Sequence, residues 1–265
     1  MALRSTASGP PRASWGWALA GAAIGLVVAM VLYAPARWLS GTVRDATGER
    51  LVLDDASGTI WTGSAQLVLT GGAGSTAAAA LPTRIEWRMR PRWDGFTAQL
   101  QTACCTQAPV EIRLQPRWGG ARITVADSQA QVPAALLVGL GTPWNTLQLD
   151  GDLQLGTQGL SVEWIEGRLS VAGQAELKAQ RLSSRLSTLR PMGSYRITVT
   201  GGSAPTLQLQ TLEGALQLSG SGQWVGSRLR FSGVATAAPE REDALSNLLN
   251  IIGRRSGARS IITLG

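Results

Sequence analysis

Hydrophobic residues follow two different patterns along this chain. Residues 13–36 form one apolar run without a charged side chain, whereas from residue 51 onward apolar and polar residues alternate over many short stretches. A long continuous apolar run is typical of a membrane-spanning helix, and strict alternation is typical of strands that bury one face. The pattern therefore predicts one membrane helix followed by a β-rich domain.

The apolar run is long enough to cross a bilayer. At about 1.5 Å of helical rise per residue, residues 13–36 span roughly 36 Å, more than the roughly 30 Å of the hydrocarbon layer. Trp15 and Trp17 lie near one end of the run and Tyr33 and Trp38 near the other. Aromatic rings of this kind are enriched at both membrane interfaces, so we expect a transmembrane helix over this run.

A cleavable signal peptide is the alternative interpretation, because residues 34–36 have a small-x-small pattern. The apolar core from Trp15 to Tyr33 exceeds the roughly 7–15 residues typical of a signal, so we expect an uncleaved anchor. Basic residues flank the helix on both sides and do not decide its orientation. Since a single early span commonly leaves the long C-terminal part translocated, we expect residues 1–12 in the cytoplasm and residues 37–265 in the periplasm.

Small residues follow one face of the expected helix. Gly21, Gly25 and Ala29 recur at four-residue spacing, which lets a second helix approach closely. Such spacing also arises by chance in a segment rich in glycine and alanine. The three residues are therefore candidate helix-packing positions, and an oligomer is compatible with them.

The clearest alternation belongs to a local repeat. Ile85, Trp87 and Met89 share one face of an expected strand, and the charged residues between them share the other. Residues 85–95 end in Pro-Arg-Trp-Asp-Gly, and residues 112–120 end in Pro-Arg-Trp-Gly-Gly. We expect two successive hairpins of an antiparallel meander, with a tryptophan at each turn.

Similar alternating stretches fill the remaining chain, and glycines interrupt them about every eight to twelve residues, as in antiparallel all-β domains. The expected fold class is mainly β: one N-terminal transmembrane helix, then a single periplasmic antiparallel β-rich domain with short helices. That domain is a twisted open sheet, a sandwich or a half-barrel. The further strands are expected near residues 51–53, 66–70, 123–125, 147–155, 160–164, 167–173, 197–199, 207–210, 214–220, 228–233 and 260–264.

The segments between these strands also carry expectations. Residues 58–65, an Ile-Trp pair between glycines, predict a strand with a close backbone approach or a bulge at each end. We expect a turn at residues 54–55, a loop of small residues over 71–80 and a polar connector over 181–189. Residues 40–50 have a mixed pattern of apolar and polar residues, and we predict no helix or strand there.

Two short helices complete the domain. Residues 132–139 predict one helical turn that begins with proline and ends with glycine. Near the C-terminus, apolar residues recur at helical spacing behind a proline and acidic residues, which predicts a helix over about residues 240–252. We expect Gly253 to cap this helix, and we expect the helix to cover one face or end of the sheet.

The charge balance does not indicate nucleic-acid binding. The chain has 24 basic and 17 acidic residues and a net charge of +7. Lys178 is the only lysine, so the basic balance indicates a general preference for arginine rather than a phosphate-binding design. No basic run is interleaved with aromatic residues either. We therefore expect no nucleic-acid partner.

Cys104 and Cys105 are the whole cysteine content. Adjacent Cα atoms are about 3.8 Å apart, below the usual disulfide range, so a vicinal bond requires strain. With no histidine and no further thiol in the chain, the pair cannot complete a zinc site. We expect an unpaired couple without a role; a vicinal or intermolecular disulfide and a catalytic thiol are the alternatives.

The sequence offers little chemistry for catalysis. The absence of histidine excludes a Ser-His dyad, and no glycine-rich phosphate motif or metal-ligand spacing is present. Carboxylate chemistry stays formally open, but acids at turns and strand ends are usually solvated. We expect no enzyme, no cofactor and no catalytic, cofactor-binding or metal-binding residue. The carboxylates considered are Asp54, Asp55, Asp150, Asp152, Glu163 and Glu166.

Short motifs of glycine, tryptophan and leucine follow one another in a fixed order. They lie at residues 34–39, 58–63, 87, 91, 133–137, 191–196, 211–216, 220–224 and 245–253. In this order and spacing they resemble the type II secretion system protein N family over nearly the whole chain, although the position of Met192 is more often leucine in such a motif.

The resemblance implies a single-pass inner-membrane component of the machine that exports folded proteins from the periplasm through an outer-membrane secretin. It implies no catalytic residues, and it implies the secretin and the inner-membrane platform protein as partners. Trp93 and Trp118, at the two expected turns, are candidate partner contacts together with the loop at residues 71–80. The alternative for both tryptophans is that they cap the core.

A lipid carrier is the alternative function, because an amphipathic open sheet behind a membrane anchor can offer its leucine-rich face to acyl chains. The two functions differ in one structural respect. A lipid carrier needs that face left open as a β-groove, whereas a helix or a second sheet that covers the face would count against lipid binding.

The expected topology can be tested directly. A reporter that is active only in the periplasm, fused after Gly265, should be active, and the N-terminus of the mature protein should still precede the apolar run. A silent reporter, or a mature protein that begins after Ala36, would contradict the anchor.

Overall fold

A computed structural model describes residues 15–226 and 228–265. Its contacts divide the chain into two units that meet between Ala34 and Pro35. The first unit contains the helix α1 (Trp15–Leu32), which is long and apolar enough to be a candidate membrane span. Residues 13 and 14 of the expected transmembrane helix lie outside the described residues, and Ala36 begins a second helix instead of ending the first.

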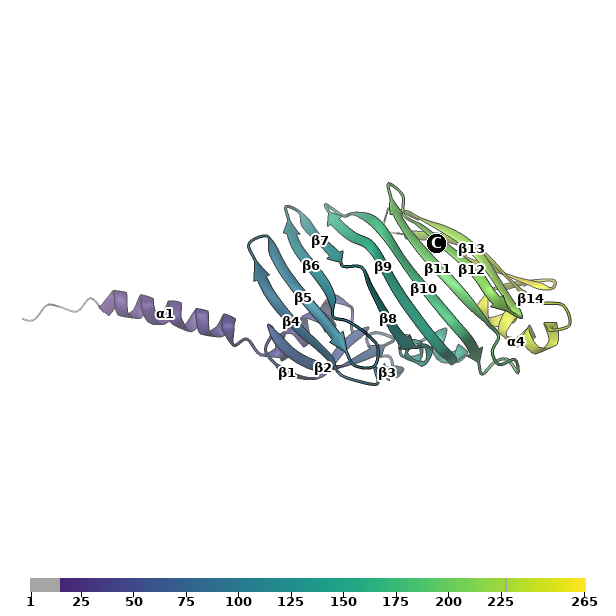
Figure 1. The fold of residues 1–265 in the computed structure, drawn as a ribbon, viewed down its shortest axis with the longest axis horizontal. Helices are drawn as coiled ribbons and strands as arrows, with labels where there is room; N and C mark the ends of the chain where they lie inside the picture. Colours follow the sequence, from purple (N-terminus) through teal and green to yellow (C-terminus); the bar gives the residue numbers. More distant parts are fainter. Residues whose placement is uncertain (1–14, 227) are drawn as a thin grey trace, which may run out of the picture. The chain divides into compact units, whose positions relative to one another are not determined.

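The second unit is built from short helices and many strands (Figure 1). The helices are α2 (Ala36–Ala46), the 3₁₀ helix η1 (Ala134–Leu140), α3 (Trp144–Leu147) and α4 (Glu242–Ile252). The strands are β1 (Leu51–Gly58), β2 (Thr62–Thr70), β3 (Ala78–Ala80), β4 (Ile85–Arg92), β5 (Gly95–Thr102), β6 (Val110–Arg117), β7 (Gly120–Val125), β8 (Ser128–Pro133), β9 (Leu149–Ile165), β10 (Arg168–Ser184), β11 (Gly193–Gly202), β12 (Thr206–Gly214), β13 (Leu216–Val225), β14 (Arg228–Ala237), β15 (Arg254–Ser256) and β16 (Arg259–Leu264).

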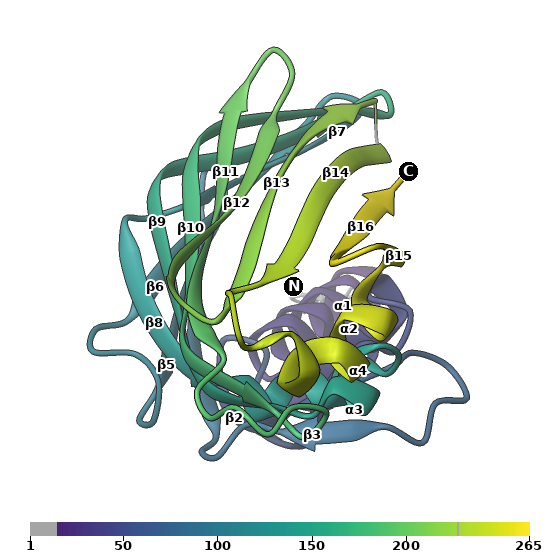
Figure 2. The ribbon, with the colours of Figure 1, turned by 90° about the vertical axis from the view of Figure 1, so that its right-hand side faces the viewer.

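All of these strands belong to one antiparallel sheet. Its order is β1-β2-β4-β5-β6-β7-β9-β10-β11-β12-β13-β14-β16-β15, with β3 added to β2 and β8 added to β9. The order follows the sequence closely, as a meander does, and the path ends at β1 and β15 without closing. Figure 2 shows that the sheet curls along this path. The mainly β expectation is confirmed, and among the three architectures the structure is the open sheet.

The two ends of the strands differ in what connects them. Hairpins β1–β2, β4–β5, β6–β7, β9–β10, β11–β12 and β13–β14 all turn at one end, which we call the hairpin end. The helices α2, η1, α3 and α4 lie in connections at the opposite end, which we call the helix end. Both ends can be followed in Figure 2.

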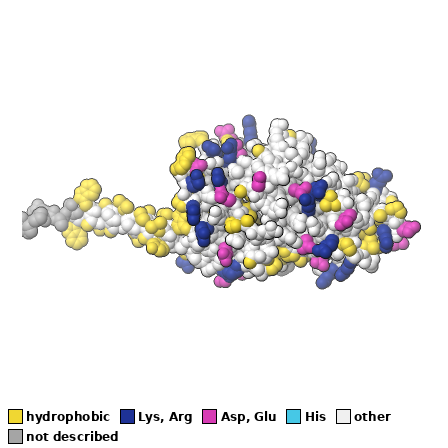
Figure 3. Space-filling model, viewed as in Figure 1, with side chains coloured by type: hydrophobic (Ala, Val, Ile, Leu, Met, Phe, Trp, Pro, Cys, Tyr) yellow, Lys and Arg dark blue, Asp and Glu magenta, His cyan; other side chains and the backbone are white. Residues whose placement is uncertain are grey.

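The strand register separates apolar from polar side chains. Phe96 lies opposite Leu114, which lies opposite Ile123. The same apolar face continues across the sheet through Val162 to Val171. The other face carries most of the charged and amide side chains, with both signs of charge interspersed (Figure 3). The alternation seen in the sequence therefore produces one continuous apolar face.

α4 covers the apolar face at the helix end. Its residues Leu245, Leu248 and Leu249 are fully buried and pack in the largest hydrophobic cluster with Tyr195 and Leu216. The expected C-terminal helix over about residues 240–252 is confirmed within two residues, and so is its position over one end of the sheet. Gly253 directly follows the helix, but its backbone is extended, so the expected left-handed cap is absent there.

α2 and η1 extend this cover. α2 packs Ala36, Leu39 and Val43 against a second cluster that includes Trp87, and η1 brings Leu136 into a third. Residues 40–50, to which the sequence pattern assigned no element, thus contain most of an amphipathic helix. Its apolar residues lie at helical spacing, i, i+3 and i+7, but they are too few to stand out from the polar residues around them. The short helical turn expected at residues 132–139 is confirmed as η1.

Several expected strands and turns were wrong. Residues 59–61 form the turn between β1 and β2 and not a strand, and residues 54–55 lie inside β1 at a register shift. Part of the expected loop over residues 71–80 pairs with β2 as β3. The expected connector over residues 181–189 begins within β10.

The longest strands were also underestimated. β9 and β10 each run for 17 residues through glycines that were expected to end them. The register shifts beside Gly173, so a bulge absorbs the irregularity and the pairing resumes beyond it. The final strand expected near residues 260–264 is confirmed as β16.

The buried leucines of α4 predict a stability effect. Replacing Leu249 by alanine should lower the free energy of unfolding by about 2–5 kcal/mol, because a fully buried side chain leaves a cavity. Ile251, which is 45% exposed on the same helix, provides the control, and its replacement by alanine should cost less than about 1 kcal/mol. Denaturant unfolding of the full chain in detergent measures both values; equal losses would contradict this packing of α4.

Candidate interaction surface

Trp93 and Trp118 lie at the turns of the two neighbouring hairpins β4–β5 and β6–β7. The repeat therefore forms two hairpins, as expected. Trp93 is 93% exposed and Trp118 is 98% exposed, so neither tryptophan caps the core. Figure 3 shows hydrophobic and basic side chains gathered over these hairpin tips. Large apolar side chains held in water at two adjacent turns are candidate contact points.

The apolar face remains uncovered toward the hairpin end. Phe96, Leu114, Ile123 and Trp164 are between 39% and 48% exposed, although they lie on the same face as the buried residues beneath α2 and α4. They are neighbours on adjacent strands. We call these four residues, together with Leu264 of β16, the uncovered apolar face.

The sequence pattern alone did not separate covered from uncovered positions. Leu100 and Phe96 have the same parity on β5, yet only Leu100 packs against the buried cluster around Trp87. The distinction depends on the lengths of the helices at the helix end. No local signal in the sequence shows how far along the strands those helices reach.

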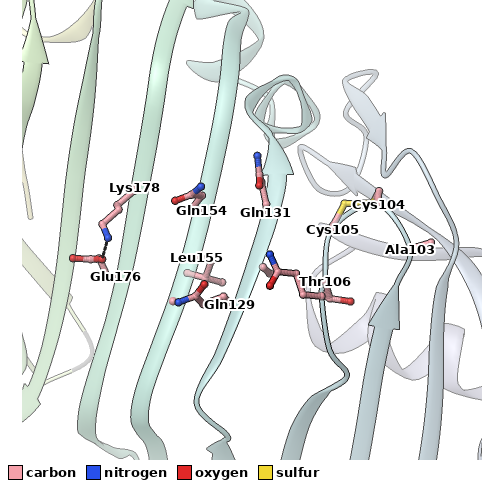
Figure 4. Close-up of a pocket in the computed structure, with 13 residues that line it drawn as sticks. Ala103, Cys104, Cys105, Thr106, Gln129, Gln131, Gln154, Leu155, Glu176 and Lys178 are labelled. Atoms are coloured by element: carbon pink, nitrogen blue, oxygen red, sulfur yellow. Dashed lines mark ion pairs between the residues drawn. A yellow bond between two sulfur atoms is a disulfide. The ribbon is translucent and has the colours of Figure 1, made fainter.

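A shallow pocket lies on the polar face beside Cys104 and Cys105 (Figure 4). Four glutamines contribute to its lining, and its two charged residues are already paired, since Lys178 Nζ lies 2.8 Å from Glu176. Arg196 Nε, outside the lining, lies 3.0 Å from the same carboxylate. Among the described residues, no group of three potential metal ligands occurs. The pocket thus shows polar surface without a metal-ligand set.

Cys104 and Cys105 form a vicinal disulfide, so the expectation of an unpaired couple was wrong. Their Cα atoms are 3.7 Å apart, and the bond closes because the chain turns there: the amide nitrogens of Cys105 and Thr106 both donate to the carbonyl oxygen of Thr102. Cys105 is buried beside Leu136, whereas Cys104 is exposed. Sequence spacing gave only the Cα distance and not the direction of the side chains in the turn.

The tryptophan of the family motif has a structural role. Trp87 Nε1 donates to the carbonyl oxygens of Thr59 and Ile60, both at 3.2 Å, and so fastens β4 to the β1–β2 turn. A Cβ at Gly63 would lie 2.5 Å from the Trp87 ring, so only glycine leaves room for it. The close backbone approach expected at this glycine is therefore present.

The motif at residues 191–196 is also structural. The carbonyl oxygen of Met192 accepts hydrogen bonds from the amide nitrogens of Ala215 and Leu216. The hydroxyl of Tyr195 donates to the carbonyl oxygen of Leu216 at 3.1 Å, and burial raises the pKa of this phenol. The hydroxyl therefore stays protonated and keeps its bond at neutral pH.

The candidate carboxylates do not gather into one site. Asp55 pairs with Arg84, Asp152 with Arg181 and Glu163 with Arg122, each at a different place on the sheet. Asp54, Asp150 and Glu166 also lie apart, at strand irregularities or turns. Ion pairs with arginine therefore hold three of the six carboxylates.

Gly21, Gly25 and Ala29 lie on the described helix α1, at the expected spacing. A Cβ at Gly21 or Gly25 would meet no atom within 4 Å, so this face is open. Their role in helix packing stays a prediction.

Taken together, these features define a class of protein: a chain with one candidate membrane span followed by an open amphipathic antiparallel sheet whose surfaces suit association. The family model described as "Type II secretion system (T2SS), protein N" matches residues 49–262. The match covers most of the chain, so the chain belongs to this family, and the resemblance seen in the motifs is confirmed. No curated protein and no solved structure matches the chain.

The disulfide can be tested chemically. Cys104 and Cys105 should react with an alkylating reagent only after reduction, which intact-protein mass spectrometry measures. Reduction should cost well below the roughly 3 kcal/mol that a bond closing a 15-residue loop contributes, because adjacent residues close no loop of the unfolded chain. Labelling before reduction would contradict the disulfide. A fall of several degrees in melting temperature after reduction would contradict its small expected contribution to stability.

Proposed function

We propose that this chain is a non-enzymatic inner-membrane component of the type II secretion system that takes part in the export of folded proteins from the periplasm across the outer membrane. The family match over residues 49–262 carries the proposal. α1 (Trp15–Leu32) anchors the chain in the inner membrane, and residues 37–265 lie in the periplasm. Support for this placement comes from the apolar helix near the N-terminus.

The proposed partners are other secretion components, namely the secretin and the inner-membrane platform protein. One edge of the sheet suits a protein contact better than the other. At β1, α2 shields the edge, since Ser40 Oγ donates to the carbonyl oxygen of Leu53 and the hydroxyl of Thr47 accepts from the amide of Leu51. At the opposite edge, all three residues of β15 (Arg254–Ser256) are exposed, which leaves a short strand open to pairing.

Trp93 and Trp118 remain proposed contact points with the envelope. Their exposure supports a contact, because water is a poor environment for two indole rings at adjacent turns. It does not by itself distinguish a protein partner from lipid.

A lipid-carrying function is the second candidate. It depends on an apolar face that is left open, and the helices cover this face only at the helix end. The uncovered apolar face therefore favours lipid binding as a further activity of the same chain.

Deleting the gene should lower the release of exported proteins or the amount of assembled secretin.

A photo-reactive benzoylphenylalanine at Arg254 of the full chain should capture the secretin or the platform protein in intact cells, and immunoblotting identifies the captured protein. The same residue at Gln208, exposed in the middle of the polar face, is the matched control and should capture neither. Replacing Glu166 by glutamine should leave secretion unchanged. Normal secretion after deletion, together with no specific adduct at residue 254, would overturn the proposal.

A further inference from the structure

Tryptophan and arginine recur together at the hairpin end of the sheet. Four of the hairpins there carry both, at or next to the turn. The pairs are Arg92 and Trp93, Arg117 and Trp118, Trp164 and Arg168, and Trp224 and Arg228. Since these hairpins are spread from β4 to β14, the pairs form a rim along most of the sheet (Figure 1).

This rim continues directly into the uncovered apolar face. Trp164 lies one residue from the end of β9 and opposite Ala121, two positions from the pairing of Ile123 with Val162. Farther along the sheet, Trp224 lies opposite Leu229, and Phe231 lies opposite Leu264. A molecule at the rim therefore meets a continuous apolar surface below it.

On the uncovered face, the side-chain groups that can form a hydrogen bond are the indole N–H donors of tryptophans such as Trp164 and Trp224. From β4 to β16, the side chains on this face near the hairpin end are aliphatic, aromatic, proline or glycine. The backbone groups beneath them are used in strand pairing. Protein–protein interfaces typically contain about one hydrogen bond per 100–200 Å² and use both donors and acceptors, whereas the side chains of this face offer no oxygen acceptor. Acyl chains need none.

The charges at the rim also indicate which kind of molecule can bind there. The tips of these four hairpins carry a net charge of +2, from four arginines and two carboxylates. These residues are Arg92, Arg117, Arg168, Arg228, Asp94 and Glu166. Arg92 lies 3.7 Å from Asp94, whereas Arg117, Arg168 and Arg228 have no ion pair among the described residues. Guanidinium groups that are free and exposed bind phosphate well. Tryptophan beside arginine is also the composition found where proteins meet the lipid headgroup region.

We propose that the hairpin end binds a phospholipid of the membrane, with acyl chains along the uncovered apolar face and the phosphate at the arginines of the hairpin tips. Trp93 and Trp118 then contact the lipid headgroup region and not a protein partner. The candidate membrane span of the same chain keeps this surface near a supply of lipid. The inference does not depend on which secretion component the chain contacts.

The test uses the full chain in liposomes of phosphatidylethanolamine and phosphatidylglycerol. Benzoylphenylalanine is introduced singly at Phe96 or Ile123, on the uncovered face, and at Thr124, the neighbour of Ile123 on the polar face. After irradiation, mass spectrometry of the protein should show phospholipid adducts at residues 96 and 123 and essentially none at 124. Because the same strand carries both kinds of position, general proximity to the membrane cannot produce the difference.

Substitutions then test the two parts of the site separately. Ile123→Arg should lower the adduct at residue 96 about tenfold, since it places a charge among acyl chains, whereas Thr124→Arg should not. Arg117→Ser combined with Arg168→Ser should lower the share of phosphatidylglycerol in the adduct. If Ile123→Arg does not fold, as its melting temperature would reveal, the comparison of labelling positions stands alone.

Three results would overturn the inference. They are equal labelling of residues 123 and 124, the absence of any lipid adduct, and a protein adduct at residues 96 and 123 that identifies a second copy or a secretion component as the occupant. None of them bears on the edge contact at β15 or on secretion after gene deletion, so the two proposals fail independently.

Discussion

An open sheet with one apolar face must bury that face against something, because exposed apolar area is unfavourable in water. This constraint organises the whole second unit. Strand register keeps leucine, isoleucine, valine and aromatic side chains on one face from β1 to β16, and every covering helix lies in a connection at the same end of the strands. Helices of 4 to 11 residues cannot reach along strands of up to 17. The cover therefore ends part of the way along the face.

The polar face is stabilised in a different way. Arginines there pair with carboxylates on adjacent strands, such as Arg122 with Glu163, and glutamines bond across the ladder, such as Gln180 with Gln154. These contacts are partly exposed, so each contributes modestly to the free energy of unfolding. These contacts keep the polar face compatible with water and support the strand register. The buried clusters beneath α2 and α4 provide most of the stability.

The family motifs hold this architecture together. Trp87 fastens a hairpin turn, and the leucines near residue 245 fill the core at the helix end. Met192 and Tyr195 join the start of β11 to the start of β13, through Ala215 and Leu216. Gly220 also has a structural role, because a Cβ there would lie 2.5 Å from the ring of Phe231 on the adjacent strand β14. A sequence that preserves these positions preserves an open amphipathic sheet. Such a sheet suits a component that works by contact.

The sequence by itself determined the apolar helix, the mainly β class, the two Pro-Arg-Trp hairpins and the C-terminal helix, because each follows from periodicity over a short window. It also carried the family resemblance. Only the tertiary structure decided that residues 59–61 turn, that β9 and β10 run through their glycines, that Cys104 bonds to Cys105 and that Trp93 and Trp118 stay exposed. The uncovered apolar face is the clearest case. Phe96 and Leu100 have the same parity in one strand, and their burial differs because covering depends on how far distant helices reach, a property that no local pattern contains.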